Sequence, residues 1–288
     1  MLMSVYLRNL AFVSCALFAS ASAPAQEVGV PAEHHPWGRF PVGSWKLTRV
    51  ITENLDPLGN VISTSIHETK TTLEAASATS FTLRFEVTTE LSGKRFVGKP
   101  QTRVLGYSGN GGGETVSAKK TGDAQVEVNG HKIPCQVRQV SFESMGTKYE
   151  GTICVNPTIS PYVLRKEETA TGTTDGAKAT TIVEVVALAP VRVLADRRNA
   201  AFIRKIEKQG DRTTTTLETT CDDIPGGEVA HSSQEQNAEN KTLRRTTLEL
   251  LDYSVGNEQP SENWGGRLRV RHRARSRRAD DMPSSPRR

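Results

Sequence analysis

Three cysteines in the body of the chain, Cys135, Cys154 and Cys221, are the residues with the most distinctive chemistry. Cys135 and Cys154 fall on two consecutive predicted strands that are joined by a short turn. A turn centred between Ser144 and Met145 places these two cysteines directly opposite each other, within the range of Cα separations that a disulfide spans. The sequence therefore predicts a Cys135–Cys154 disulfide, and the alternative is three buried thiols that act as small apolar side chains.

The sequence contains no recognisable motif for catalysis or metal binding. The six histidines match neither the spacing of a zinc ribbon nor that of an H-E-x-x-H helix. They are His34, His35, His67, His131, His231 and His272. Glu167 and Glu168 are adjacent carboxylates on a predicted strand, where neighbouring side chains face opposite ways. Asp222 and Asp223 are adjacent carboxylates in a predicted turn. No Gly-x-Ser-x-Gly motif occurs, so we expect no catalytic residue, no metal and no cofactor.

The C-terminal segment 256–288 concentrates positive charge. In an extended chain, its alternating arginines would lie on one side and could contact a row of phosphate or sulfate groups. These arginines are Arg267, Arg269, Arg271, Arg273, Arg275 and Arg277. A segment so rich in charge and poor in aromatic residues does not form a core, so a solvated, disordered end is the alternative.

The rest of the chain is slightly acidic. The whole sequence has a formal net charge of +5, of which the nine Arg and two Asp from Asn263 onward contribute +7 and Arg8 contributes +1. The remaining charge is 5 − 7 − 1 = −3. This balance gives no reason to expect a face that binds nucleic acid.

Residues 1–25 have the organisation of a cleavable signal peptide. Arg8 precedes a short apolar run at 10–18, and Ala23-Pro24-Ala25 fits the cleavage site, so we expect cleavage after Ala25. The run is shorter than the roughly 20 residues of a spanning helix. An uncleaved anchor or a cytosolic helix is the alternative, and the apolar residues after Cys15 argue against a lipoprotein signal. We expect an exported protein of the periplasm, envelope or medium, with no membrane span in its mature chain.

Alternating apolar and polar residues predict strands with one solvated face. In Phe81–Leu91 the apolar residues share one parity, which places them on one face of a strand. A second pattern, from Val126 to Val137, turns at Asn129-Gly130, a pair that favours a type I′ hairpin turn. These patterns predict an all-β protein built from antiparallel sheet meanders.

The middle of the chain contains an apparent repeat. Residues 137–140 match 203–206 at an offset of 66, and Thr180-Thr181-Ile182 matches Thr246-Thr247-Leu248 at the same offset. Cys154 matches Cys221 at an offset of 67. We therefore predict that 131–190 and 197–255 are two copies of one β-meander, with chance similarity among Thr-rich strands as the alternative. The repeat requires a strand at Asp196–Gly210, where an amphipathic helix is the competing interpretation.

The glycine-rich run at 110–113 predicts a boundary between an N-terminal β unit, 26–109, and a larger unit, 114–255. The alternative is a long loop within one sheet. The run lacks the Gly-Lys-Ser/Thr of a phosphate loop. Two related meanders can pack face to face or join into one curved, half-barrel sheet.

Three short features resemble uncharacterised exported bacterial β proteins. These features are Gly43-Ser44-Trp45, the segment 130–135, and the Ile-x-Pro and Ile-Pro-Gly turns that begin at Ile159 and Ile224. The resemblance covers roughly residues 40–255, and the group is broadly similar to half-barrel periplasmic lipoprotein carriers. It implies a curved sheet and, by analogy alone, a ligand cavity, and it transfers no functional residue.

The sequence thus predicts an exported, non-enzymatic binding or structural protein with an apolar or polymeric ligand from the envelope. The alternative is a secreted hydrolase whose acidic residues meet only in three dimensions. A concave apolar cavity would favour binding, whereas a polar cleft with clustered acids or histidines would favour catalysis.

Overall fold

The computed structural model describes residues 32–78, 80–107, 116–144, 146–172 and 177–256. The predicted signal peptide, the glycine-rich run at 110–113 and the arginine-rich tail lie outside these residues.

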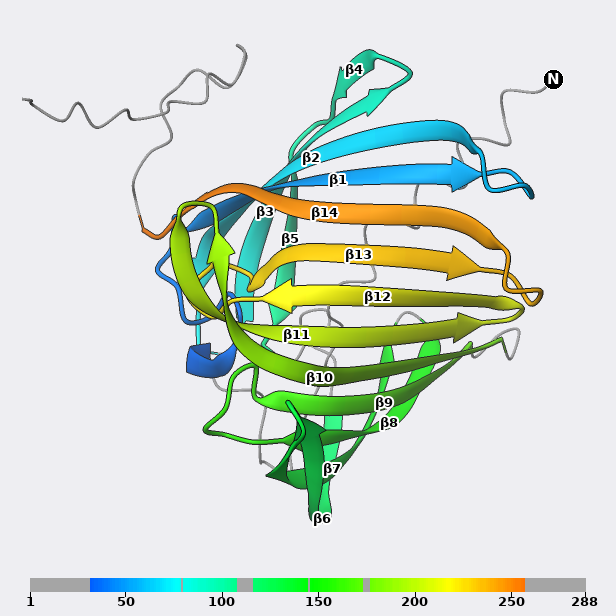
Figure 1. Cartoon of the computed structure of the whole chain (residues 1–288). Coiled ribbons are helices and arrows are strands. Elements are labelled where there is room, and N and C mark those ends of the chain that lie inside the picture. Colours follow the sequence, from blue (N-terminus) through cyan, green and yellow to red (C-terminus); the bar gives the residue numbers. More distant parts are fainter. Residues whose placement is uncertain (1–31, 79, 108–115, 145, 173–176, 257–288) are drawn as a thin grey trace, which may run out of the picture. The chain divides into compact units, whose positions relative to one another are not determined.

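Within the described residues, fourteen strands form one antiparallel sheet, which confirms the all-β prediction (Figure 1). A short 3-10 helix, Ala32–His34, precedes the strands. The strands are β1 (Trp45–Leu55), β2 (Val61–Ala76), β3 (Ser80–Leu91), β4 (Lys94–Val97), β5 (Gln101–Gly106), β6 (Val116–Val128), β7 (His131–Ser144), β8 (Thr147–Val155), β9 (Val163–Gly172), β10 (Lys178–Val193), β11 (Asp196–Gln209), β12 (Arg212–Thr220), β13 (Glu228–Gln236) and β14 (Thr242–Ser254). The predicted strand over Asp196–Gly210 is thereby confirmed as β11.

The order of strands follows the chain except at one point. The order is β4-β3-β2-β1-β14-β13-β12-β11-β10-β9-β8-β7-β6, and β5 also pairs with β3. Pairing of β1 with β14 joins the strands on the two sides of the glycine-rich run into one sheet. Among the described strands the sheet is open, because β4 and β6 stand at opposite ends of the order.

The hairpins of this sheet recur at intervals of 65 residues. The hairpin β6–β7 turns after Val128 and has a bulge at Thr121, and β10–β11 turns after Val193 and has a bulge at Val186. A third bulge, at Leu251, interrupts the pairing of β14 with β1. A bulge adds one residue to one strand and bends it, so the three bulges place equivalent bends along the sheet.

The observed spacing corrects the residue pairs predicted from the sequence. Val137 is opposite Gly122, immediately after the first bulge, and Phe202 is opposite Ala187, immediately after the second. Val137 is therefore equivalent to Phe202 and not to Ile203, and a difference of one residue changes the face of the sheet. The descent of 131–190 and 197–255 from one unit remains a prediction.

The same correction applies to the cysteine match. Backbone hydrogen bonds from Asn156 to Tyr162 and from Cys221 to Gly227 close equivalent loops, at 2.8 Å in both cases. Cys221 is therefore equivalent to Asn156, and its predicted match with Cys154 is wrong.

One end of the buried face is covered by the bent hairpins. Val126 and Val128, at the end of β6–β7, pack with Leu164, Val185 and Ile203 of β9–β11. The side chain of Asn129, in the β6–β7 turn, links this hairpin to β10. Its Oδ1 accepts a hydrogen bond from Leu188 N at 2.8 Å, and its Nδ2 donates one to Leu188 O at 2.7 Å. We call this end, where apolar residues pack, the apolar half.

The end of β10–β11 packs in a similar way against the next strands. Val193 and Ala200 contact Cys221, Ile224 and Leu250 in a second apolar cluster. A third cluster forms where Trp37 and Tyr107 cover Leu73, Phe81 and Leu83. Each cluster belongs to the apolar half.

Further along the same face, the inward side chains are polar. We call this region the polar half, and it contains Thr52, Lys205, Glu207, Thr214, Thr216, Ser233, Glu235 and Thr246. Burial alternates along β13, where Ser233 and Glu235 are half-buried or buried while Ser232 and Gln234 are exposed. The period of two is that of an ordinary half-buried strand, but the buried side here is hydrophilic.

Candidate functional site

Three buried ionisable side chains and one half-buried histidine lie at the border between the apolar and polar halves. Lys46 lies on β1, Glu218 on β12, and Glu228 and His231 on β13, and we call them the buried charge network. Lys46, Glu218 and Glu228 are only 8%, 7% and 3% exposed. Ionised side chains are seldom buried so deeply without partners, so the contacts within the network decide what it does.

Glu228 is the centre of the network. The Lys46 ammonium donates to the Glu228 carbonyl oxygen at 3.1 Å, and His231 Nδ1 donates to Glu228 Oε1 at 2.6 Å. Burial alone would raise the pKa of Glu228, but the hydrogen bond from His231 and the charge of Lys46 bring that pKa below its usual value. Glu228 is therefore a buried anion with a cation beside it.

Glu218 is the unsatisfied member of the network. It lies directly opposite His231 in the pairing of β12 with β13. Burial, followed by the negative charge of Glu228, raises the pKa of Glu218 to about 8, against the weaker opposing effects of Lys46 and Lys205. Its Oε1 atom is buried and has no hydrogen-bond partner among the described residues. At neutral pH this carboxyl group is therefore largely protonated.

A protonated Glu218 beside an ionised Glu228 has the protonation states of a general acid and a general base. Both side chains, however, are more than nine-tenths buried. A substrate atom must come within hydrogen-bond distance of such groups for proton transfer. The network as it stands holds β1, β12 and β13 together and exposes little to a reacting molecule.

The polar half offers some more accessible hydrogen-bonding groups, since Thr216, Ser233 and Thr246 are half-buried, whereas Thr52 is only 6% exposed. The hydroxyl of Thr216 donates to Ser233 Oγ at 3.1 Å, and the hydroxyls of Thr52 and Thr246 lie 3.5 Å apart. Lys205 pairs with Glu207 at 3.0 Å. Hydroxyl groups, ammonium groups and carboxylates thus form rows across β1 and β11–β14, with both donors and acceptors within reach of a polar molecule.

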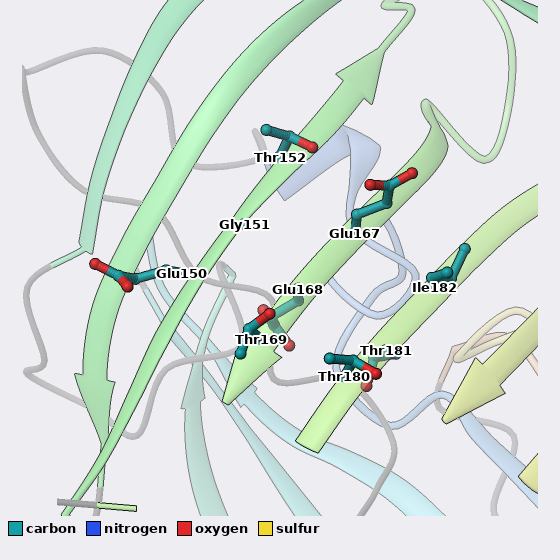
Figure 2. Close-up of a pocket in the computed structure, with 9 residues that line it drawn as sticks. All are labelled: Glu150, Gly151, Thr152, Glu167, Glu168, Thr169, Thr180, Thr181 and Ile182. Atoms are coloured by element: carbon teal, nitrogen blue, oxygen red, sulfur yellow. The ribbon is translucent and has the colours of Figure 1, made fainter. Parts of the chain in front are cut away.

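A separate hollow of about 410 Å³ lies over β8, β9 and β10 (Figure 2). Its three acids each pair with a cation on the same strand. The pairs are Glu150 with Lys148 at 2.7 Å, Glu167 with Arg165 at 2.5 Å, and Glu168 with Lys166 at 2.9 Å. The hollow is therefore electrostatically balanced and makes a poor site for a cation.

Gly151 explains why β8 and β9 approach closely beside this hollow. A Cβ atom at Gly151 would lie 2.1 Å from the carbonyl oxygen of Glu167. Glu168, opposite Gly151, is mostly buried, whereas the neighbouring Glu167 is half exposed. The two carboxylates face opposite ways, as the strand pattern predicts.

The predicted opposition of Cys135 and Cys154 is wrong. Ser144 pairs with Thr147, so the turn is centred one residue later than predicted and Cys154 faces Val137. Cys135, Cys154 and Cys221 are all free thiols. Cys135 is nevertheless a diagonal neighbour of Cys154, and burial, together with a hydrogen bond to Cys154, raises the pKa of Cys135 to about 11. A disulfide between them stays a prediction.

Three of the described histidines outside the network have local partners. His34 stacks on Tyr162, with ring centroids 4.1 Å apart, and His67 Nδ1 lies 2.9 Å from the hydroxyl of Thr89. His35 Nδ1 accepts from Trp37 N and Gly38 N, and burial lowers its pKa to about 4. Within the described part of the chain, no group of three or more His, Cys, Asp or Glu side chains could hold a metal ion.

Sequence patterns did not indicate the buried charge network. Lys46 and Glu228 are 182 residues apart and meet only because β1 pairs with β14. The one local signal is that β12 and β13 carry polar residues on both faces. Such a pattern is typical of an exposed strand, and the burial of one face appears only in the folded sheet.

Comparisons with known proteins give weak similarities. No protein-family model matches the sequence, and no curated protein matches it. A structure described as a putative lipoprotein from Parabacteroides distasonis matches with a TM-score of 0.32 and 9% identity, over 75% of this chain and 97% of that chain. A putative exported protein with a YmcC-like fold from Bacteroides fragilis matches with a TM-score of 0.31 and 11% identity, over the same shares. Both similarities are weak in structure and in sequence.

Among the described residues, no helix is long and apolar enough to cross a membrane.

Proposed function

We propose that this is an exported, non-enzymatic binding protein whose ligand lies on the polar half of the sheet. Export is supported by the charge, apolar run and cleavage site of residues 1–25. Binding is supported by one observation above all, the hydrophilic inward face of β1 and β11–β14. A face that stabilises only the fold would gain more from apolar side chains, because burial of polar groups yields little net free energy.

The ligand is polar rather than apolar. The apolar half is already occupied by the bent ends of β6–β7 and β10–β11, which pack into the first two apolar clusters. The hydroxyls of Thr216, Ser233 and Thr246 and the Lys205–Glu207 pair suit a molecule rich in hydroxyl and amide groups. A polymeric glycan or glycopeptide of the envelope has this chemistry. An apolar ligand, which the sequence also predicted, would find few apolar side chains to contact on the polar half.

A binding screen tests this proposal. The full chain is titrated with muramidase-solubilised peptidoglycan, with dextran and with palmitate, and affinity is followed by calorimetry. We expect saturable binding of at least one of the two saccharide probes and none of palmitate. Binding of palmitate alone would contradict the assignment of a polar ligand, and binding of none of the three would contradict the proposed class.

The Glu218–Glu228 pair supports a second candidate, a secreted hydrolase. Their pKa values move in opposite directions, as those of an acid and a base do. If this candidate is correct, the chain cleaves one of the saccharide probes and Glu228→Gln abolishes the cleavage. Binding without release of new reducing ends would favour the non-enzymatic function.

A further inference from the structure

The hairpin β3–β4 lies at one end of the sheet order (Figure 1). It carries exposed apolar side chains. Leu91, Phe96 and Val97 are 41%, 56% and 79% exposed. All four residues of β4 are exposed. Because Phe96 and Val97 are consecutive in a strand, they point to opposite faces, and the hairpin is uncovered on both faces.

A second exposed apolar group lies at the neighbouring hairpin. Leu58 in the turn between β1 and β2 is 87% exposed, and Val61 and Ile62 at the start of β2 are 49% and 67% exposed. Twelve large apolar side chains are strongly exposed among the described residues, and six of them belong to these two hairpins. Single exposed apolar residues are ordinary, but such a concentration marks an interaction surface.

Positive charge accompanies the apolar residues of β3–β4. Lys94 and Arg95 lie in β4, Lys99 follows it, and all three are exposed. Glu90 lies opposite Arg95 in the pairing of β3 with β4, and the guanidinium of Arg95 pairs with Glu68 of β2 at 3.3 Å. Residues 90–99 carry a net charge of +2.

The acidic residue of the other hairpin is engaged locally. The carboxylate of Asp56 accepts from Leu58 N, Asn60 N and Asn60 Nδ2 at 2.8–3.0 Å. The carboxylate oxygens of Asp56 therefore point toward the backbone of the β1–β2 turn, and the side chain of Leu58 is exposed to solvent. The β3–β4 hairpin thus combines apolar side chains with a local excess of cations, whereas the β1–β2 turn combines Leu58 with the negative charge of Asp56.

We propose that the β3–β4 hairpin docks the protein on the surface of an anionic lipid bilayer. Phe96 and Val97 enter the boundary between headgroups and acyl chains, and Lys94 and Lys99 contact lipid phosphates. An apolar tip bordered by Lys and Arg has the composition that binds at this depth. The β1–β2 turn, with Leu58, adds a second point of contact.

Vesicle sedimentation tests the proposal with the full chain. The vesicles contain either phosphatidylcholine alone or equal parts phosphatidylcholine and phosphatidylglycerol. We expect binding to the anionic vesicles that weakens with salt, and little binding to the neutral vesicles. The double variant Phe96→Ser/Val97→Ser should weaken binding by about tenfold or more, since each side chain loses its transfer out of water.

Three variants serve as controls. Leu217→Ser removes an apolar side chain that is 58% exposed on β12, outside the hairpin, and should bind as the unmodified chain does. Lys94→Ser/Lys99→Ser should weaken binding severalfold, while Lys119→Ser/Lys120→Ser on β6 should not. Unchanged circular dichroism and Tm show that the hairpin variants remain folded.

The arginine-rich tail is the competing source of binding to anionic lipid. If Phe96→Ser/Val97→Ser binds as tightly as the unmodified chain while replacement of Arg267, Arg269 and Arg271 by Ser abolishes binding, the hairpin proposal is overturned. Failure of the full chain to bind the anionic vesicles also overturns it. Loss of heparin binding instead of vesicle binding in the hairpin variant would indicate a polyanion partner and contradict the lipid assignment.

Discussion

The two halves of the buried face differ in what covers them. In the apolar half, bulged hairpins fold over their neighbours, so Leu164, Val185 and Ile224 are at most 1% exposed. In the polar half the strands continue without such a cover, and Thr216 and Ser233 remain partly accessible. The comparison indicates that most of the apolar packing lies at one end of the sheet, although Val140 and Phe142 pack with Tyr149 near the other end of β7 and β8.

The bulges explain how one sheet produces both halves. The bulges at Thr121 and Val186 bend β6 and β10 before their turns, and each bent end closes a small apolar cluster. Beyond the bulge the strands run regularly and present rows of Thr, Ser, Lys and Glu. Substitutions in the two halves should therefore have unequal effects on stability.

The largest expected effect is the loss of a core side chain from the apolar half. Leu164 is fully buried in the first cluster. Leu164→Ala should lower the free energy of unfolding by about 2–5 kcal/mol, through lost burial and the cavity left behind. Thr214→Ala in the polar half should change it by less than about 0.5 kcal/mol. Urea unfolding measures both values, and equal losses would show that the halves do not differ in this way.

A somewhat smaller effect is expected where β8 and β9 approach most closely. Gly151→Ala places a Cβ atom 2.1 Å from the Glu167 carbonyl oxygen, so the strands must separate. We expect a loss of about 1–3 kcal/mol, as for other overpacked sites. Gly122→Ala is the matched control, because its Cβ meets nothing within 4 Å. A Tm for Gly151→Ala equal to that of Gly122→Ala would rule out the close approach.

At the border of the halves, Glu218 should make stability depend on pH. Its pKa in the folded chain, about 8, is above the unfolded value of about 4.5. Its contribution is thus fully present below pH 4.5 and is lost as pH rises through 8. The unmodified chain should lose about 3 kcal/mol of stability between pH 5 and pH 8 through this group, and Glu218→Gln should remove that loss.

Urea titrations at the two pH values measure this difference. Glu207→Gln, on the adjacent β11, is the control and should leave the pH dependence unchanged. A Glu218→Gln variant with the pH dependence of the unmodified chain would indicate that Glu218 is solvated.

The smallest expected effect concerns the two cysteines at the edge of the apolar half. In an oxidising compartment Cys135 and Cys154 should join, since they are diagonal neighbours with interacting thiols. The two cysteines are not directly opposite each other, so we expect a disulfide between them to be strained. This strain should offset most of the stabilisation from loop closure and leave a net stabilisation of less than about 1 kcal/mol. Non-reducing peptide mapping detects the bond. Complete alkylation of both thiols in exported protein would exclude it.

The sequence predicted the strands better than their meeting points. Alternation in Phe81–Leu91 and the Asn129-Gly130 turn correspond to β3 and to the β6–β7 hairpin, since both are local signals. The turn near residues 144–147 is centred one residue later than the sequence predicts, which changes the register of β7 with β8. The spacing of the repeated hairpins is 65 residues, one fewer than the predicted offset of 66. Bulges and turn centres depend on packing between strands, which a single segment does not reveal.

The buried charge network lay beyond sequence reasoning for a similar reason. Its members come from β1, β12 and β13, and Glu218 and His231 become opposite only through the register of the sheet. The polar half also looks exposed in the sequence, because its inward and outward residues are equally hydrophilic. Which side is buried depends on the arrangement of the whole sheet.

The most direct test of the central claim compares two adjacent serines on β13. Ser233 faces inward in the polar half and Ser232 faces solvent. In calorimetric titrations with the saccharide probe that binds the unmodified chain, Ser233→Trp should weaken binding by at least about tenfold, because the indole fills the surface that the ligand needs. Ser232→Trp should bind with unchanged affinity. If both variants bind equally well, the ligand does not lie on the polar half.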